Sequence, residues 1–484
     1  MPWQPSRSDL SDLINNQNPW FGTGSVPQEM AKPIKRPFAQ LAWQALLRTE
    51  LQRYQFVLGP RRVGKTTVMY QTVQRLLEQG IPSGNLWWLR LDHPLFMSLN
   101  LGDLAKFLLD STTNIGYDTP IYFFLDELVY MDDWALWLKA FYDDFKPIRV
   151  MATSSATAAI QRSHVESGVG RWEVQYLSTY LFTEYLDLCG KTVDVNVAST
   201  LAGTIQNAVK NVRLSPDIER ERRRFLLIGG FPELLTTKPT SDETSDLLRS
   251  QNVLRNDAIE RAVYKDIPQA FGVQDPLKLE RLLYTLAGQM TGQLSPQKLA
   301  TDLGFNVTTL DRYLSFLQQS FIVFTLPNYA GSEETVQRRG RKIYFVDGAV
   351  RNAALLRGLS PLTDLSEMGV LLENAVAAHM HALSRQSGVR VYHWRQHPHE
   401  VDLIYDDPNG PLAFEVASSP THHTRALIEF QERFPIFRNR CYLVCPGIQP
   451  IQPEQHGGVG RLPLDLLLIA AGAQAYKALE GRFA

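Results

Sequence analysis

The chain has 484 residues, of which 44% are hydrophobic and 20% are charged, as is ordinary for a soluble globular protein of several domains. A formal net charge of −1 excludes a generally basic surface for nucleic acid, so any such contact needs a local patch. Three cysteines are too few for a disulfide framework and fit a reducing compartment. The amino-terminal residues lack the apolar core of a signal peptide, and no apolar run reaches the roughly 18 residues of a membrane span. We therefore expect a cytoplasmic protein with no membrane partner.

The amino-terminal third of the chain divides into an arm and an α/β domain. Residues 1–32 are rich in Pro, Asn, Gln and Gly and are predicted to form a flexible arm. In residues 33–176, short apolar runs alternate with helical patterns, which predicts a doubly wound domain with a parallel sheet. We expect strands at 54–58, 86–91, 121–125 and 148–152, and helices at 66–79, 103–110 and 134–145.

The loop after the first predicted strand has the pattern of a phosphate-binding site. Backbone N–H groups of such a glycine-rich loop surround a triphosphate, and the following helix adds the positive end of its dipole. Lys65 is expected to reach the β- and γ-phosphates, and the Thr66 hydroxyl to bind Mg²⁺. The sequence therefore predicts binding of ATP with Mg²⁺. The loop consists of Gly59, Pro60, Arg61, Arg62, Val63, Gly64, Lys65, Thr66 and Thr67.

The third predicted strand ends in two carboxylates, Asp126 and Glu127. Ligands of open parallel sheets lie beyond the carboxyl ends of the strands, so Asp126 is placed to hold Mg²⁺ and Glu127 to act as the catalytic base for water. The next strand ends in a Ser/Thr cluster, which is typical of a turn or cap but could also sense the γ-phosphate. For that sensor we favour Ser155, with Thr153 as the alternative.

Arg171 is a candidate for stabilising the transition state through its positive charge, and Arg222 to Arg224 are rivals. An arginine that acts on another copy of the chain would require a homo-oligomer. The rivals lie in residues 177–288, which are predicted to form a helical lid or linker. On a helix, such a basic cluster is more often a solvated face.

Residues 289–330 are predicted to form a winged helix-turn-helix. A first short helix follows Ser295 and Pro296 and ends at Gly304, a second spans 308–319, and a wing strand covers 322–326. Thr308, Thr309 and Arg312 could contact double-stranded DNA. The adjacent Asp311 and the scarcity of cations also fit a module that packs against protein.

Taken together, these segments resemble the prokaryotic AAA-type ATPases of the archaeal ATPase group that are fused to a carboxy-terminal domain of unknown function with a restriction-endonuclease-like core. The resemblance runs from about residue 33 to the end of an α/β domain at 331–484. Besides the phosphate loop, it rests on Ile34–Pro37, Leu125–Glu127, Gly170–Arg171, Phe182–Leu186, Gly229–Pro232, Leu299–Gly304, Phe345–Asp347, Gly369–Asn374, His393–Arg395, Glu400–Asp402 and Glu415–Val416.

The resemblance implies that Glu373, Asp402 and Glu415 occupy the acidic positions of a PD-(D/E)xK nuclease core, where carboxylates gather around Mg²⁺. The family pattern has a lysine two residues after the last acid, and Ala417 stands there in this chain. Nuclease activity is therefore not expected, although the carboxylates could still bind a metal ion. The alternative is that Glu400 and Asp402 lie on the polar face of a β-hairpin.

Two functions follow from this sequence. The first is a Mg²⁺-dependent ATPase that rearranges its winged-helix and nuclease-like domains, acting on DNA or on a protein partner. The second is an ATP-gated DNA- or protein-binding switch with little turnover. The presence of Glu127 favours hydrolysis, and Ala417 argues against a third function, that of an ATP-dependent nuclease.

Overall fold

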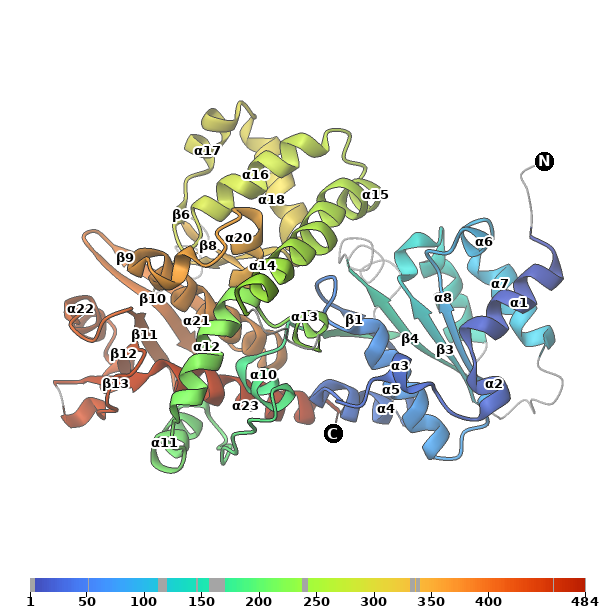
Figure 1. The fold of residues 1–484 in the computed structure, drawn as a ribbon, viewed down its shortest axis with the longest axis horizontal. Coiled ribbons are helices and arrows are strands. Elements are labelled where there is room, and N and C mark those ends of the chain that lie inside the picture. The colour runs from blue at the N-terminus through green and yellow to red at the C-terminus, as the bar shows by residue number, and fades with distance from the viewer. Residues whose placement is uncertain are drawn as a thin grey trace. The chain divides into compact units, whose positions relative to one another are not determined.

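The structure is a computed structural model that describes residues 5–50, 52–111, 120–144, 147–155, 170–236, 243–330, 336, 340–455 and 457–483. The chain divides into two compact units (Figure 1). The first unit contains residues 1–177 with 269–272 and Phe483, and the second contains the other residues from Ser178 onward.

The first unit is built on a five-stranded parallel sheet, which confirms the predicted parallel α/β core. Four of its strands are the four expected from the sequence, and β5 is added at the edge. In the inner strands β1, β3 and β4 every residue is buried, as expected of a parallel sheet covered on both faces. The strand order is β2-β3-β4-β1-β5. The strands are β1 (Tyr54–Leu58), β2 (Leu86–Arg90), β3 (Ile121–Asp126), β4 (Ile148–Ser154) and β5 (Trp172–Tyr176).

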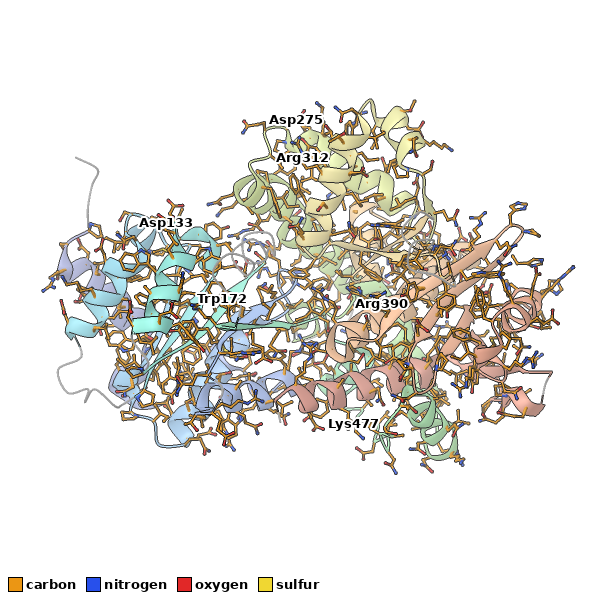
Figure 2. All side chains as sticks on the ribbon, turned by 180° about the vertical axis from the view of Figure 1, so that it is seen from behind. Asp133, Trp172, Asp275, Arg312, Arg390 and Lys477 are labelled. Carbon is orange, nitrogen blue, oxygen red and sulfur yellow. The ribbon has the colours of Figure 1, made fainter. Side chains whose placement is uncertain are left out.

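The helices of this unit cover both faces of the sheet. The chain moves along the sheet in one direction from β1 to β2, and in the opposite direction from β2 through β3 to β4. Because parallel crossovers are right-handed, α5 lies on one face and α7 and α8 lie on the other. Trp134 of α8 packs against Phe56 and Trp172, with ring centroids 5.7 and 5.6 Å away; Trp172 is labelled in Figure 2. The bounds are α4 (Pro37–Leu47), α5 (Lys65–Glu78), η1 (Ser83–Asn85), α6 (Pro94–Met97), α7 (Leu101–Ser111), η2 (Leu128–Tyr130) and α8 (Trp134–Asp144).

The amino-terminal segment differs from the predicted flexible arm, because it contains α1 (Arg7–Gln17), α2 (Trp20–Thr23) and α3 (Gln28–Ala31). The Asn18 side chain pairs with both backbone groups of Trp88 on β2, accepting from its N–H at 2.6 Å and donating to its carbonyl at 2.9 Å. The fully buried Trp20 donates its indole N–H to the Leu86 carbonyl at 2.9 Å. These contacts satisfy backbone groups on the outer edge of the sheet, which would otherwise offer a site for pairing with another strand.

The second unit begins with a helical region. One sharp turn in it joins two of the segments on which the family resemblance rests. The Gly230 amide donates to the Asp347 carboxylate at 2.7 Å, and a Cβ on Gly230 would lie 2.1 Å from the Tyr180 carbonyl oxygen, so only glycine fits. The helices along this stretch of the chain are α10 (Phe182–Leu188), α11 (Leu201–Asn211), α12 (Pro216–Ile228), α13 (Pro232–Thr236), α14 (Glu243–Leu254), the π-helical η4 (Arg255–Glu260) and η5 (Ala262–Asp266), α15 (Ile267–Phe271) and α16 (Pro276–Gly288). Residues 269–271 of α15 are counted in the first unit.

A small three-stranded antiparallel sheet follows, in the order β6-β8-β7. Its strands are β6 (Gln293–Leu294), β7 (Val323–Pro327) and β8 (Arg341–Phe345), and α17 (Pro296–Leu303) and α18 (Val307–Gln319) lie between β6 and β7 in the chain. Gly304 ends α17 with a φ of +69°, and the Asn306 side chain caps α18 by accepting from the Thr309 amide at 2.7 Å. The order along the chain is helix, strand, helix, helix, strand, strand.

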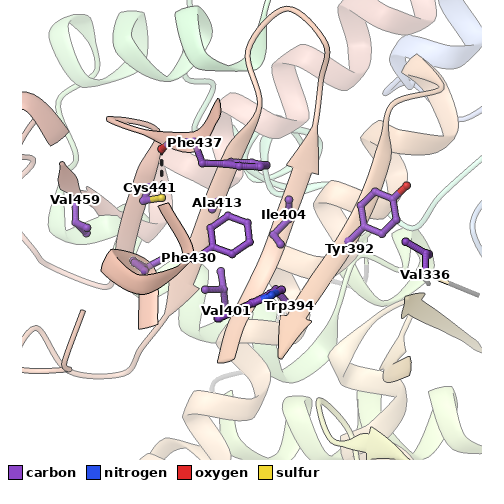
Figure 3. Packing of buried hydrophobic residues seen from close by; sticks show 11 residues of the cluster. Val336, Tyr392, Trp394, Val401, Ile404, Ala413, Phe430, Phe437, Cys441 and Val459 are labelled. Atoms are coloured by element: carbon purple, nitrogen blue, oxygen red, sulfur yellow. Dashed lines mark hydrogen bonds between the residues drawn. The ribbon is translucent and has the colours of Figure 1, made fainter. Parts of the chain in front are cut away.

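The carboxy-terminal part contains a five-stranded mixed sheet in the order β13-β12-β11-β10-β9. Phe430 of α22 packs on one face of this sheet, against a cluster that includes Trp394, Val401 and Cys441 (Figure 3). No helix of the described ranges combines the length and the apolar character needed to span a membrane. The elements are α20 (Gly348–Ala354), η6 (Ser360–Leu362), α21 (Leu365–Ser387), β9 (Arg390–Gln396), β10 (His399–Asp406), β11 (Leu412–Val416), α22 (Arg425–Arg433), η7 (Pro435–Phe437), β12 (Cys441–Cys445), η8 (Pro453–Gln455), β13 (Val459–Pro463) and α23 (Leu464–Phe483).

Asn18→Ala should loosen the outer edge of the first sheet. The substitution leaves both backbone groups of Trp88 without the amide that pairs with them, which costs about 1–3 kcal/mol of local stability. We expect faster amide hydrogen exchange across β2, measured by mass spectrometry. Asn16→Ala is the matched control, because Asn16 is exposed on α1, and its exchange should stay at the wild-type rate. Equal protection of β2 in both variants would contradict an edge-capping role for Asn18.

Candidate functional site

The strand order of the first unit gathers the predicted site residues at one edge of the sheet. β4 lies between β1 and β3, with Leu58 of β1 opposite Ser154 and Leu125 of β3 opposite Ala152. The phosphate loop follows β1, and Asp126 ends β3, so the end of β4 lies between them. Three strands therefore present their carboxyl ends to one site, as in other open α/β sheets that bind ligands.

The phosphate loop is tightly held by backbone contacts. A Cβ on Gly59 would lie 2.1 Å from the Leu177 carbonyl oxygen, and Gly64 has a φ of +89° where α5 begins. The ammonium group of the buried Lys65 donates to the carbonyls of Gly59 at 3.0 Å and Pro60 at 2.9 Å. The loop is therefore already curved around its own lysine, with the start of α5 directed to the same place.

Arg36 supports this loop from outside, a role that the sequence reasoning did not assign. Its guanidinium is buried and donates to the Val63 carbonyl at 3.1 Å. Arg36 belongs to the Ile34–Pro37 segment of the family resemblance, and that position was the available signal. The contact holds the loop at Val63, two residues before Lys65 begins α5.

The carboxylate of Asp126 contacts two other predicted site residues, Thr66 and Thr153. It accepts a hydrogen bond from the Thr66 hydroxyl at 2.8 Å and another from the Thr153 hydroxyl at 2.5 Å. The Thr153 oxygen in turn accepts from the Glu127 amide at 3.1 Å. Thr66 and Asp126 thus offer oxygen donors side by side, which is the chemistry that Mg²⁺ prefers, and the pair fits the predicted metal role.

Glu127 follows in an unusual backbone conformation, with a φ of +55°. Such values are uncommon for residues other than glycine and gather at functional sites. Its carboxylate accepts from the Ser155 hydroxyl at 3.2 Å and from the Ser155 amide at 3.3 Å. The two sensor candidates therefore have different surroundings, because Ser155 contacts the candidate base and Thr153 contacts the candidate metal ligand.

Burial raises the pKa of Asp126 from 3.8 to about 6, and the neighbouring charge of Glu127 acts in the same direction. The hydrogen bonds from Thr153 and Thr66 and the charge of Lys65 act against this rise without cancelling it. A buried carboxylate with too little positive charge around it is a place where a cation would be stabilised. This electrostatic imbalance is a second observation that fits a metal ion beside Thr66.

The structure does not support a role for Arg171 in the site of its own chain. Its carbonyl accepts from the amide of Tyr54, at the start of β1, whereas the phosphate loop follows the end of that strand. A strand of this length rises by roughly 13 Å. The Arg171 guanidinium pairs instead with Asp143, with nitrogen-to-oxygen distances of 2.9 and 3.1 Å. Arg171 therefore lies beside the amino-terminal ends of the strands, opposite to the phosphate loop.

The rival arginines lie in α12, in the second unit. Arg222 has only 4% of its side chain exposed and pairs with the Asp465 carboxylate at 2.5 Å, so it is held inside that unit. Arg223 pairs with Glu219 at 3.0 Å on the exposed face of the same helix. The cluster is therefore in part a buried ion pair and in part the solvated face that the charge pattern favours.

The second predicted cluster is brought together, but around a lysine. Glu373 of α21 and Asp402 of β10 lie 2.8 and 3.0 Å from the Lys342 ammonium nitrogen, and Glu415 lies close by on β11. Across the described ranges, no group of three or more His, Cys, Asp and Glu side chains is arranged to hold a metal ion. The Lys342 ammonium thus lies among the predicted metal ligands. The sequence reasoning missed Lys342, although a lysine within an apolar strand was a signal.

Comparison with known families finds three matching segments. Residues 52–186 match the family of the AAA domain. Residues 368–466 match a domain of unknown function (DUF4143), and residues 219–362 match another (DUF8612). Together with the parallel sheet and the phosphate loop, the AAA match supports an AAA-type ATPase that carries a carboxy-terminal DUF4143 domain.

Two curated relatives have a similar sequence. An uncharacterised protein of Methanocaldococcus jannaschii is 26% identical over 339 residues, which is 68% of each chain. An uncharacterised protein of Haemophilus influenzae is 22% identical over 387 residues, 78% of this chain and 86% of the relative. The similarity therefore extends well beyond the AAA domain.

Among solved structures, a Walker-type ATPase of Pyrococcus abyssi aligns at 12% identity and a TM-score of 0.34, covering 66% of this chain and 95% of that one. A mutant of the RuvB protein of Thermotoga maritima aligns at 17% identity and a TM-score of 0.28, covering 64% and 95%. Both scores are too low to carry an argument about this chain.

Asp126→Asn should stabilise the first unit in the absence of metal and nucleotide. An acid whose pKa rises from 3.8 to about 6 on folding gives stability at low pH that is lost as pH increases through 6. A neutral amide avoids this loss, so the variant should gain about 1–3 kcal/mol at pH 8 and less at pH 5.

Tryptophan fluorescence during thermal unfolding in EDTA reports on this unit, because every tryptophan except Trp394 lies within residues 1–177. Asp132→Asn, at an exposed aspartate nearby, is the control and should change little at either pH. If Asp126→Asn is less stable than the wild type at pH 8, the result would show that the buried charge of Asp126 does not destabilise the first unit.

Proposed function

We propose that this chain is a Mg²⁺-dependent AAA-type ATPase that hydrolyses ATP at the edge of the first sheet. The observation that carries the proposal is the contact between Thr66 and Asp126, 2.8 Å long, directly beside the buried Lys65. These three residue types at the ends of β1 and β3 are the parts with which P-loop NTPases hold phosphates and Mg²⁺. The match of residues 52–186 to the AAA domain supports the same function.

Each residue has a distinct role in this proposal. The loop amides and Lys65 bind the β- and γ-phosphates, and the ammonium of Lys65 exchanges its loop carbonyls for phosphate oxygens. Mg²⁺, held by Thr66 and Asp126, would neutralise charge on those phosphates when bound. Glu127 accepts a proton from the attacking water, and Ser155 orients its carboxylate through two hydrogen bonds.

Thr153 has the role of positioning both acids. Its hydroxyl donates to Asp126 and accepts from the Glu127 amide, so it fixes the separation of the metal ligand from the base. Since it also lies next to the last residue of β4, between the two neighbouring strands, a change at the phosphates reaches both acids through it. This arrangement supports Thr153 as a sensor at least as well as Ser155.

Glu127→Gln should abolish turnover and leave ATP binding intact. The amide has the shape of the acid but cannot accept the proton, and general-base catalysis contributes roughly 10²- to 10⁴-fold. Steady-state phosphate release should fall by at least about 10²-fold, while the Kd for a fluorescent ATP analogue changes little. Asp132→Asn is the matched control and should keep full activity.

Phosphate release by the wild type and by Glu127→Gln should be measured with and without double-stranded DNA. Faster release in the presence of DNA distinguishes a DNA-coupled ATPase from one that acts on a protein partner. If the wild type binds ATP tightly but does not hydrolyse it, the result would contradict the ATPase proposal and support the ATP-gated binding switch. Turnover by Glu127→Gln at the wild-type rate would show that another group is the base.

Arg171 acts, in this proposal, on the nucleotide of a second copy of the chain. Its place beside the amino-terminal ends of the strands and its partial exposure, 28% of the side chain, support delivery to a neighbour. The Asp143 pair would then hold the guanidinium until the neighbour binds ATP. This role makes the active form of the protein a homo-oligomer.

Arg171→Ala should therefore lower ATP turnover by about 10-fold or more without weakening ATP binding. Mixing it with the Lys65→Ala variant should restore part of the activity. In the mixture, a Lys65→Ala chain supplies its intact Arg171 to the intact phosphate site of an Arg171→Ala chain. Phosphate release from the mixture and from each variant alone measures this. Arg75→Ala, at a partly exposed arginine of α5 that pairs with Glu78, is the control. Mixtures no more active than the sum of their components would contradict action between copies.

The second unit supplies the part that ATP hydrolysis would move. The order α16, β6, α17, α18, β7, β8 supports a winged helix-turn-helix, in which α18 would face DNA or a protein partner. Thr308 and Arg312 are exposed on α18, and Arg312 is labelled in Figure 2. The exposed Asp311 beside them limits affinity for phosphate, so a protein partner remains the alternative.

A further inference from the structure

The ammonium group of Lys342 lies inside the carboxylate cluster of the second unit. Only 3% of this side chain is exposed. Its nitrogen lies 2.6 Å from Glu400, 2.8 Å from Glu373 and 3.0 Å from Asp402. The ammonium donates hydrogen bonds to Glu373 and Asp402, and Glu400 forms an ion pair with it. The geometry is that of a cation coordinated by the residues around it.

The cluster has more negative than positive charge. Four acids, including Glu415, share Lys342, and at the rim Arg395 lies 3.6 Å from Glu400. Burial raises the pKa of Glu373 to about 7, with the charge of Asp402 acting in the same direction, and burial likewise raises the pKa of Glu415. One oxygen of Glu415 is buried without a hydrogen-bond partner within the described residues. Raised pKa values let such carboxyl groups take up protons, and a cation among them stabilises the carboxylates that stay charged.

Lysine and a divalent metal ion cannot both supply that charge. Mg²⁺ or Ca²⁺ takes its oxygen ligands at roughly 2.0–2.6 Å, and the Lys342 nitrogen already lies between the same oxygens. Burial works against the charge on Lys342, but Tyr344 and the carboxylates of Asp402, Glu373 and Glu400 outweigh it and hold its pKa above the ordinary value. The lysine is therefore charged at every physiological pH.

Lys342 also connects two sheets of the unit. It comes from β8 of the three-stranded sheet, whereas its partners come from α21 and from β10 of the carboxy-terminal sheet. Tyr344, two residues along β8, adds a hydrogen bond to Glu373 at 2.8 Å. The same strand therefore supplies both the cation and a neutral donor to the cluster.

We propose that Lys342 is the built-in cation of this cluster, that it excludes a divalent metal ion, and that it clamps the three-stranded sheet to the carboxy-terminal sheet. Metal-dependent cleavage of a phosphodiester bond is then absent from this unit for a reason additional to Ala417. The proposal concerns the second unit alone and does not rest on ATP hydrolysis in the first.

The test counts Mn²⁺ ions by electron paramagnetic resonance in nucleotide-free full-length chains that all carry Asp126→Asn, which removes the metal ligand of the first unit. With Lys342 present, we expect no tightly bound Mn²⁺. Lys342→Ser opens the cluster and should bind about one Mn²⁺ through the carboxylate oxygens. Lys342→Arg is the matched control, since it keeps the charge, and it should bind none.

Thermal unfolding gives a second readout. Lys342→Ser should unfold at a lower temperature than the parent, and Mn²⁺ should raise that temperature while leaving the parent unchanged. Tight Mn²⁺ binding by the parent that Glu373→Gln abolishes would overturn the proposal. A folded Lys342→Ser chain that binds no Mn²⁺ would overturn it as well.

Lys342→Ser with its unbalanced carboxylates could fail to fold. A second variant, Lys342→Met combined with Glu373→Gln, removes one charge of each sign and should unfold at a higher temperature than Lys342→Met alone. No recovery in the double variant would contradict charge compensation as the role of Lys342. The Mn²⁺ count of the parent chain decides the exclusion of metal whether or not these variants fold.

Discussion

The charge on a few buried carboxylates is the constraint around which both units are organised. A carboxylate taken out of water is costly unless hydrogen bonds or a cation compensate for it. In the first unit, Asp126 is compensated in part, by two threonine hydroxyls, and its raised pKa records the part that is missing. The first unit thus keeps an electrostatic deficit at the place where phosphates and a cation would be bound.

The second unit meets the same constraint in the opposite way. Lys342 supplies positive charge from within the chain, and Tyr344 adds a neutral hydrogen bond. A cation that is covalently part of the fold cannot leave, so this cluster contributes to structure but offers no vacant coordination position. The two clusters differ in how freely their compensating charge can exchange, and that difference distinguishes the proposed ATPase site from the cluster that we propose to hold two sheets together.

Local sequence signals were sufficient for much of the first unit. The apolar runs before Gly59 and Asp126 predicted buried parallel strands, because strands covered on both faces have no polar side. Sequence reasoning could not give the strand order, and that order decides which polar residues meet. It is the position of β4 between β1 and β3 that brings Thr153 to Asp126. The parallel pairing of β5 with β1 places Arg171 at the opposite ends of the strands. The role of Lys342 was not predicted from the sequence for the same reason, since its partners are brought to it only by tertiary packing.

Family-specific segments of the second unit encode packing more than chemistry. The Gly230 amide binds the Asp347 carboxylate, which joins two such segments at a turn where a side chain would not fit. His379 joins another, because its Nε2 accepts from the Phe182 amide at 2.9 Å while its other ring nitrogen lies 2.7 Å from the Ala375 carbonyl. Burial lowers the pKa of His379 to about 4, so the ring is neutral and free to accept at Nε2. A residue pattern that identifies a family can therefore mark the joints of its fold, and only the contacts around each residue distinguish a joint from a site.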